Sequence, residues 1–284
     1  MILAEPPAPA SLTEGATAIL ASADPAAKVA LSRVLAAGWR RGDMPVGRAT
    51  PPPRPARPAC PELRRPRDMP RRRNFGSHTG RIALLHALAH IELNAIDLAW
   101  DIVARFHDAD LPRGFFTDWL GVAAEEAEHF ALLSARLAVL GSFYGALPAH
   151  DGLWEAAAAT AHDLIARLAV VPLVFEARGL DVTPDMTRRL ERTGDLESAA
   201  ILGRIYHDEI GHVAIGARWF NAICDRRGLD PEATFHDQVR RCFRGALKPP
   251  FNHAARDQAG IPAGFYEPLA PPSLQDPRCI AAAS

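Results

Sequence analysis

Four long stretches of the chain carry apolar residues at intervals of three and four, the spacing that places them on one face of an α-helix. In the first stretch, for example, Leu84, Leu88 and Ile91 recur in this way. No stretch shows the strict alternation that is typical of a half-buried strand. The pattern therefore predicts an all-α fold, with long helices over 79–106, 112–140, 152–180 and 195–227.

Capping residues define several of these boundaries. Gly141 follows the second stretch, as glycine commonly does at the end of a helix, and Asp195 stands as N-cap of the fourth. Pro172 lies inside the third stretch. Because proline removes a backbone donor, we expect it to kink this helix one turn before Glu176.

Shorter helices are expected around this set. Ser11 and Glu14 form a capping box, which opens a short helix near the N-terminus. An Asp-Pro pair commonly places proline at the first helical position. The sequence therefore predicts helices over 25–41 and 231–245, and a short connecting helix that starts at Thr183-Pro184.

Proline separates the N-terminal helices from the long ones. Eight prolines between positions 51 and 70 deny this stretch regular helix or central strand. We therefore expect an extended arm over about 43–78, with polyproline character. The tail, KPPFNHAARDQAGIPAGFYEPLAPP, is again rich in proline and glycine, and we expect it to be irregular.

The arm is strongly basic although the whole chain has a net charge of −1. Between Arg40 and Arg81 there are 12 arginines and three acidic residues, so the rest of the chain is acidic. One reading is that the arm lies over the acidic helical body, and we favour it. The other is a strip that contacts RNA through residues such as Arg71, Arg72 and Arg73. Few aromatic residues are interleaved there, which weakens a base-stacking version.

The cellular compartment is predicted from the absence of membrane-spanning and signal-peptide patterns. The sequence has no apolar run of the roughly 20 residues that span a bilayer, and its N-terminus does not resemble a signal peptide. Four scattered cysteines, Cys60, Cys224, Cys242 and Cys279, show no Cys-x-x-Cys pairing. Free thiols in a reducing cytosol are the simplest reading. We expect a cytoplasmic protein that does not bind membranes.

A repeated pattern of glutamate and histidine carries the functional prediction. Two Glu-x-x-His motifs, Glu126/His129 and Glu209/His212, each place a carboxylate and an imidazole on one helix face. Glu92 precedes the first motif by 34 residues, and Glu176 precedes the second by 33. Glu92 and Glu176 have largely apolar neighbours, so both are expected to point inward, where a carboxylate needs a partner, a proton or a metal.

These six residues form the ligand set of a dinuclear carboxylate site in a helical bundle. Oxygen-rich ligation with one imidazole per metal suits iron or manganese. The predicted cofactors are therefore two Fe ions, with Mn or a mixed Mn/Fe pair as the alternative.

Other polar residues on the same helices have two readings each. His86 and His90 are four residues apart, but His90 lies about 160° from Glu92 around the helix. Interhelix hydrogen bonding or support of the metal ligands is the favoured role for this pair. Tyr206 stands one turn before Glu209 and is the candidate catalytic residue, as a source of a proton or an electron. A packed tyrosine with a satisfied hydroxyl is the plainer reading.

Five stretches of the sequence are distinctive, namely GRIALLHALAHIELNAIDLAWD, DWLGVAAEEAEHFALL, YGALPAHDGLWE, FEARGLDVTP and DEIGHVAIGARWF. Together they resemble an uncharacterised bacterial ferritin-like family, the domain of unknown function numbered 455. The resemblance implies a ferritin-like four-helix bundle with a di-iron centre, in which Glu126 and Glu209 bridge the metals. More distantly, Glu176-Ala-Arg178 and the Glu-x-x-His motifs are similar to those of tRNA-modifying di-iron hydroxylases.

Three regions are predicted: N-terminal helices and arm over 1–78, the di-metal bundle over 79–228, and a helix and tail that pack on it over 229–284. The leading functional prediction is an oxidoreductase that activates O2, a hydroxylase or monooxygenase of unknown substrate. The chain carries no flavin or nicotinamide fingerprint, so an external electron donor is implied. Two alternatives stay open. One is a ferroxidase or peroxide-detoxifying protein, and the other is an RNA- or protein-binding module with a structural metal.

Overall fold

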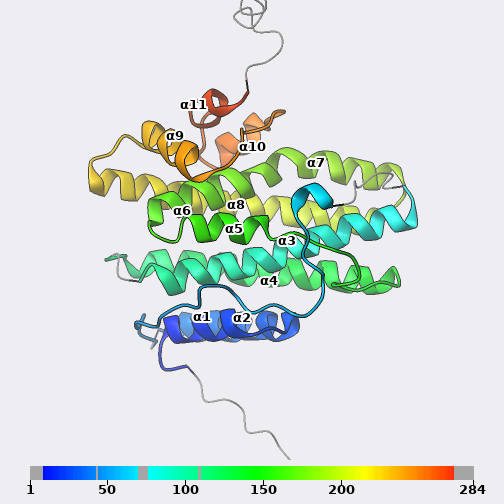
Figure 1. Ribbon diagram of the computed structural model, residues 1–284, viewed down its shortest axis with the longest axis horizontal. Helices are drawn as coiled ribbons and strands as arrows, with labels where there is room; N and C mark the ends of the chain where they lie inside the picture. Colours follow the sequence, from blue (N-terminus) through cyan, green and yellow to red (C-terminus); the bar gives the residue numbers. More distant parts are fainter. Residues whose placement is uncertain (1–8, 43, 70–75, 108–109, 272–284) are drawn as a thin grey trace, which may run out of the picture. The chain divides into compact units, whose positions relative to one another are not determined.

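The computed structural model describes residues 9–42, 44–69, 76–107 and 110–271 (Figure 1). Arg71, Arg72, Arg73 and Cys279 lie outside these residues. The chain forms two compact units. Unit 1 comprises Met1–Leu164 and Asp185–Ile205, and unit 2 comprises Ile165–Pro184 and Tyr206–Ser284.

Unit 1 is built on two long helices that pack along each other, α3 (His78–Arg105) and α4 (Arg113–Val139). Two N-terminal helices lie alongside them, with α1 (Leu12–Ala21) against α3 and α2 (Pro25–Arg40) against α4 (Figure 1). The unit also contains α5 (Gly152–Ala159).

Capping predicted from sequence is confirmed at several of these helices. Ser11 Oγ accepts from the Glu14 amide at 3.4 Å at the start of α1, and Asp24 Oδ1 accepts from the Ala26 amide at 3.0 Å at the start of α2. After α4, Gly141 has a φ of +72°, the left-handed conformation that glycine adopts without strain.

Over its described residues 44–69, the arm has no helix besides the 3-10 turn η1 (Pro66–Asp68). Several of its groups contact α3 within unit 1. Arg57 Nη2 donates to Asn94 Oδ1 at 2.6 Å, and Arg105 Nη2 donates back to the Pro52 carbonyl at 3.3 Å. Arg57 Nη1 also lies 3.2 Å from the buried Asp97 carboxylate of α3, a contact of the kind expected for a basic arm on an acidic body. RNA binding by the arm stays a prediction.

Unit 2 contains the rest of the helices. They are α6 (Leu164–Val170), the π-helical turn η2 (Val171–Glu176), the first part of α7 (Ala177–Arg192), the larger part of α8 (Leu196–Arg227), α9 (Pro231–Cys242), α10 (His253–Gln258), α11 (Ala263–Tyr266) and η3 (Glu267–Leu269). No strand occurs among the described residues, where Leu63 and Ala149 form an isolated bridge. The all-α prediction is confirmed.

The prediction of one continuous helix over 152–180 is wrong. The segment divides into α5, α6, η2 and the start of α7, with a turn at 160–163. At this turn Thr160 Oγ1 donates to the Ala156 carbonyl at 3.0 Å, so its side chain competes for a backbone acceptor. At Pro172 the chain forms a π-helical turn that ends at Glu176.

A second correction concerns Pro184, which does not start a helix but lies inside α7. Proline has no N–H, so in a helix it leaves the carbonyl four residues earlier without its usual donor. That carbonyl belongs to Leu180, and Asn252 Nδ2 donates to it at 3.1 Å. A side chain from the tail thus replaces the missing backbone donor, which allows α7 to continue.

We predict that Asn252→Ala lowers the free energy of unfolding by about 1–2 kcal/mol, because it removes this donor. The loss should be smaller when Pro184 is also replaced by alanine, since the restored N–H can then bond the Leu180 carbonyl. Urea unfolding of the two single variants and the double variant measures the coupling. Equal losses with proline and with alanine at position 184 would contradict this explanation.

The tail is also more regular than predicted, since α10, α11 and η3 form within it. Asn252 caps α10 by accepting from the Ala255 amide at 3.3 Å, and Pro262 precedes α11. Arg256 on α10 is buried and forms a two-bond ion pair with Asp181, at 2.9 and 2.7 Å. These contacts order the tail within unit 2.

In the described part of the chain, α3 is long and apolar enough to cross a membrane by length and composition alone. However, 72% of its apolar window is buried inside the protein. The same helix also buries polar groups, including Glu92, Asp97 and Asp101. Both features are those of the core helix of a soluble protein, and the cytoplasmic location stays a prediction.

Candidate metal centre

Three of the six predicted ligands meet in the core of unit 1, between α3 and α4. Glu92, Glu126 and His129 are 3%, 0% and 0% exposed, and each offers a ligand atom within 4.8 Å of the others. His129 Nδ1 lies 3.4 Å from Glu92 Oε2 and 3.5 Å from Glu126 Oε2. The Glu-x-x-His spacing thus brings a carboxylate and an imidazole together on α4, and α3 adds a second carboxylate.

The burial of two carboxylates side by side is electrostatically costly. Burial raises the pKa of Glu92 well above its usual range, and the neighbouring Glu126 carboxylate raises it further. Burial also disfavours the charged form of His129, but the Glu126 and Glu92 carboxylates outweigh it and raise its pKa to about 11. Without a metal, a proton on His129 is therefore the cation that balances the site.

The distances between these atoms are those expected for ligands of one shared metal ion. Hydrogen bonds between nitrogen and oxygen are typically about 2.7–3.2 Å long, which is shorter than both contacts of His129 Nδ1. Two donors that each lie about 2.1 Å from one metal are separated by roughly 3–3.5 Å. Glu92 Oε2 is buried and accepts no hydrogen bond from the described residues. The unit 1 triad of Glu92, Glu126 and His129 can therefore hold a metal ion.

The other three predicted ligands belong to unit 2. His212 is 1% exposed, and its Nδ1 lies 3.7 Å from Glu209 Oε2, the same pairing as in the first motif. Glu176 is half-buried and ends the π-helical turn η2. The two triads thus belong to different units. That they share one dinuclear centre stays a prediction.

Comparison with known proteins identifies the family of this chain. The family model described as "Protein of unknown function (DUF455)" matches residues 21–267, which is most of the chain and includes all six predicted ligands. The chain belongs to the DUF455 family. It is 45% identical over 209 residues to a protein of Haemophilus influenzae described as uncharacterized, and the aligned region covers 72% of each chain. No solved structure matches the DUF455 chain.

Tyr206, the candidate catalytic residue of this DUF455 chain, is held by the tail within unit 2. Its hydroxyl accepts from Asn252 Nδ2 at 3.0 Å. The backbone N–H of Asn252 in turn donates to Asp181 Oδ1 at 2.9 Å, and Asp181 forms an ion pair with the buried Arg256. Sequence reasoning missed this support, because 46 residues separate Asn252 from Tyr206 and no spacing rule relates them.

His86 and His90 support a loop of unit 1. His86 Nε2 accepts from the Gly145 amide at 2.9 Å, and its ring stacks on Tyr144. His90 bonds the Tyr144 hydroxyl at 2.9 Å and the His150 carbonyl at 3.0 Å. Both residues form hydrogen bonds, as predicted, but their partners lie in the loop segment 144–150 and not on another helix.

We predict a loss of stability in acid that depends on His86. Burial lowers the pKa of this imidazole from 6.5 to about 4, so between these values the unfolded chain binds a proton that the folded chain does not. Its contribution is complete above pH 6.5 and is lost as the pH falls toward 4, by about 1–3 kcal/mol. Urea unfolding at pH 7, 5.5 and 4 measures the loss.

The matched variant is His86→Gln, in which an amide oxygen can still accept from Gly145 without titrating. Its stability should fall less between pH 7 and 4 than that of the wild type. A fall of the same size in both proteins would assign the acid sensitivity to other groups.

Proposed function

We propose that the DUF455 chain is a ferritin-like dinuclear metalloprotein whose bundle consists of α3, α4, the segment α6–η2–α7 and α8. The proposal rests chiefly on the unit 1 triad, in which two buried carboxylates and an imidazole nitrogen gather at distances that suit ligands of one cation. The repeated Glu-x-x-His pairing in unit 2 supports it. Two Fe ions are the proposed occupants, and Mn can take the same oxygen-rich ligands.

Each triad has a proposed role at the centre. Glu92, Glu126 and His129 would hold one metal, and Glu176, Glu209 and His212 the other, with Glu126 and Glu209 as bridges. The four carboxylates would balance the charge of two divalent ions. Ala123 and Phe130, three residues before and four residues after Glu126 on α4, are buried and would help to keep bulk water from the triad.

The proposed activity is oxidation of an organic substrate by O2, of the hydroxylase or monooxygenase type. When bound, a pair of ferrous ions supplies the electrons that reduce dioxygen. Tyr206 accepts its hydrogen bond from Asn252, so its own O–H is left to donate and can provide a proton near Glu209, one helical turn away. An external reductase would restore the electrons, since the chain has no flavin or nicotinamide fingerprint.

The test is to load the protein with Fe(II) without oxygen, remove unbound iron, and count iron per chain beside the Glu92→Ala/Glu209→Ala variant. We expect about two irons in the native chain and few in the variant. Admission of O2 should then produce a new visible absorption band in the native protein alone. An absence of bound metal in both proteins would refute the proposal and leave the carboxylates as an internal ion-pair network.

A second measurement separates oxidation of a substrate from iron handling. Rapid peroxide turnover with no organic substrate, or assembly into a shell, would favour a ferroxidase or peroxide-detoxifying role over the hydroxylase. Slow peroxide turnover, together with oxygen consumption that depends on an added reductase, would favour the hydroxylase.

A further inference from the structure

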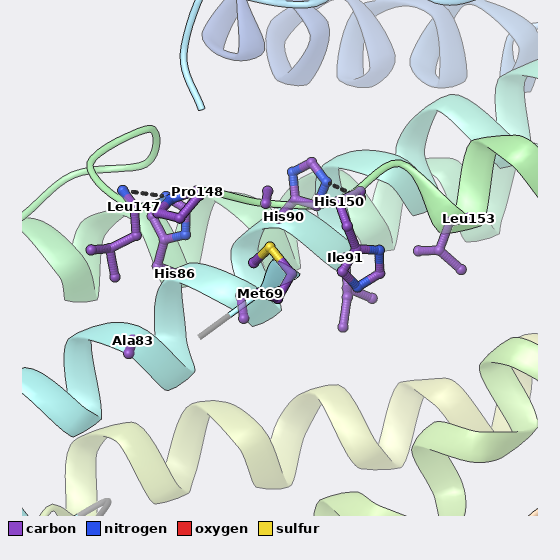
Figure 2. A pocket seen from close by; sticks show the side chains of 11 residues that line it. Met69, Ala83, His86, His90, Ile91, Leu147, Pro148, His150 and Leu153 are labelled. Atoms are coloured by element: carbon purple, nitrogen blue, oxygen red, sulfur yellow. Dashed lines mark hydrogen bonds between the residues drawn. The ribbon is translucent and has the colours of Figure 1, made fainter. Parts of the chain in front are cut away.

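Unit 1 contains a cavity of about 160 Å³ that the metal site does not use (Figure 2). Its walls come from α3, from the arm at Met69, and from the segment 147–153. The lining is mostly apolar and includes Met69, Ala83, Ala87, Ile91, Leu147 and Leu153, and its polar side chains are those of His86, His90 and His150. Among the described residues that line it, none is an aspartate, glutamate, lysine or arginine. The cavity therefore favours an uncharged occupant.

The cavity lies on the face of α3 opposite the metal triad. Ala83, Ala87 and Ile91 follow one another at intervals of four along this face. Ala87 is the middle of this stripe, and Glu92 lies about 140° from it around the helix, by the geometry of 3.6 residues per turn. A ligand in the cavity and a metal on Glu92 can therefore be tested independently.

His86 provides a polar group at one end of the cavity. Figure 2 shows its ring there, with the hydrogen-bonded nitrogen directed toward Leu147. Since Nε2 accepts amide hydrogens from Gly145 and Leu147, it carries no proton, and the neutral ring must bear its hydrogen on Nδ1. Among the described residues, Nδ1 makes no hydrogen bond. The cavity thus combines an apolar interior with a neutral N–H donor.

From this combination we propose that the cavity binds a small, neutral aromatic molecule of one ring that carries one hydrogen-bond acceptor. An apolar protein cavity of about 150 Å³ is large enough for benzene, so the size fits a single ring. The thioether of Met69 offers a favourable sulfur–aromatic contact. The N–H of His86 sets the orientation by donating to the acceptor, and the absence of lysine and arginine from the lining disfavours an anion.

Benzaldehyde, toluene and benzoate are the probes, titrated into the full-length metal-free protein and followed by ligand-observed NMR. Benzaldehyde should bind with a Kd on the order of 0.1–1 mM, as expected for a ligand of its size. Toluene, which has no acceptor, should bind about 3–10-fold more weakly. Benzoate should show no binding at the same concentrations. Failure of benzaldehyde to bind, or benzoate binding of equal strength, would overturn the proposal.

The variant Ala87→Leu places the site, because a leucine side chain would occupy the cavity. Benzaldehyde affinity should fall at least about 10-fold, while Ala138→Leu on the exposed surface of α4 should leave it unchanged. If Ala87→Leu does not fold, Ala83→Val fills the same cavity with a smaller group and should also weaken binding. Unchanged affinity in the folded cavity variant would refute the site.

Iron loading separates this proposal from the proposed function. Benzaldehyde should bind equally well to the Glu126→Gln variant, whether or not that variant takes up iron. Loss of aromatic binding together with loss of iron would instead mean that both depend on the metal centre, which contradicts a separate site.

Discussion

Replacement of Glu126 by glutamine should abolish tight iron binding and yet raise the stability of the metal-free protein, by about 1–2 kcal/mol. The carboxylate is fully buried beside Glu92, so without a metal it adds repulsion between like charges. Glutamine keeps the shape but removes the charge, and His129 retains Glu92 as its partner. Iron stoichiometry and urea unfolding of the metal-free protein measure the two effects.

Glu125→Gln is the matched control, because Glu125 is the preceding residue on α4 and its side chain is exposed. That variant should bind iron like the wild type and unfold at the same urea concentration. Two results would contradict the metal assignment. One is full iron content in Glu126→Gln, and the other is a loss of more than about 3 kcal/mol in its metal-free form, which is the cost of breaking a structural ion pair.

The largest loss of stability is expected for Asp97→Ala, at about 3–5 kcal/mol. Lys28 and Asp97 are both 0% exposed and form an ion pair between α2 and α3, and Arg57 Nη1 lies 3.2 Å from the same carboxylate. Removal of Asp97 leaves the buried ammonium of Lys28 without its counter-ion. Chemical denaturation of the variant and the wild type at neutral pH measures the difference.

A pH series tests this explanation of the Asp97→Ala variant. Burial already lowers the pKa of Lys28, and loss of the carboxylate should lower it further. The unfolded chain then binds a proton that the folded chain lacks, so stability should rise with pH up to about 10. Lys28→Met/Asp97→Leu should be more stable than Asp97→Ala, since it removes both charges. If the loss of stability in Asp97→Ala does not change with pH, its cause is lost packing and not the unpaired charge of Lys28.

Much of the helical framework could be predicted from local signals, because caps and periodicity act within a few residues. Ser11, Asp24 and Asp195 each accept from a nearby amide as their positions indicated. The errors arose where distant residues decide the local structure. Pro184 was expected to start a helix, but it lies inside α7, where the long-range donor Asn252 replaces the N–H that proline lacks.

In the candidate site, too, local features could be predicted and long-range contacts could not. The i, i+3 spacing of Glu126 and His129 is local, and the structure places both side chains in one cluster with Glu92 of α3. The tail residue Asn252 at Tyr206, and the cavity beside His86, depend on segments that meet only after folding. No pattern in the sequence specified either of them, because apolar and proline-rich segments have the same composition whether or not they enclose a ligand.

The two compact units have a consequence for synthesis of the chain. The polypeptide passes between them at 164/165, 184/185 and 205/206, and the last two passages lie inside α7 and α8. On the ribosome, unit 1 remains incomplete until residue 205 has emerged, and the apolar segment Val170–Val174 of unit 2 emerges before that point. An apolar segment therefore waits longer for its packing partners during synthesis than it would in a chain whose units follow one another without interruption.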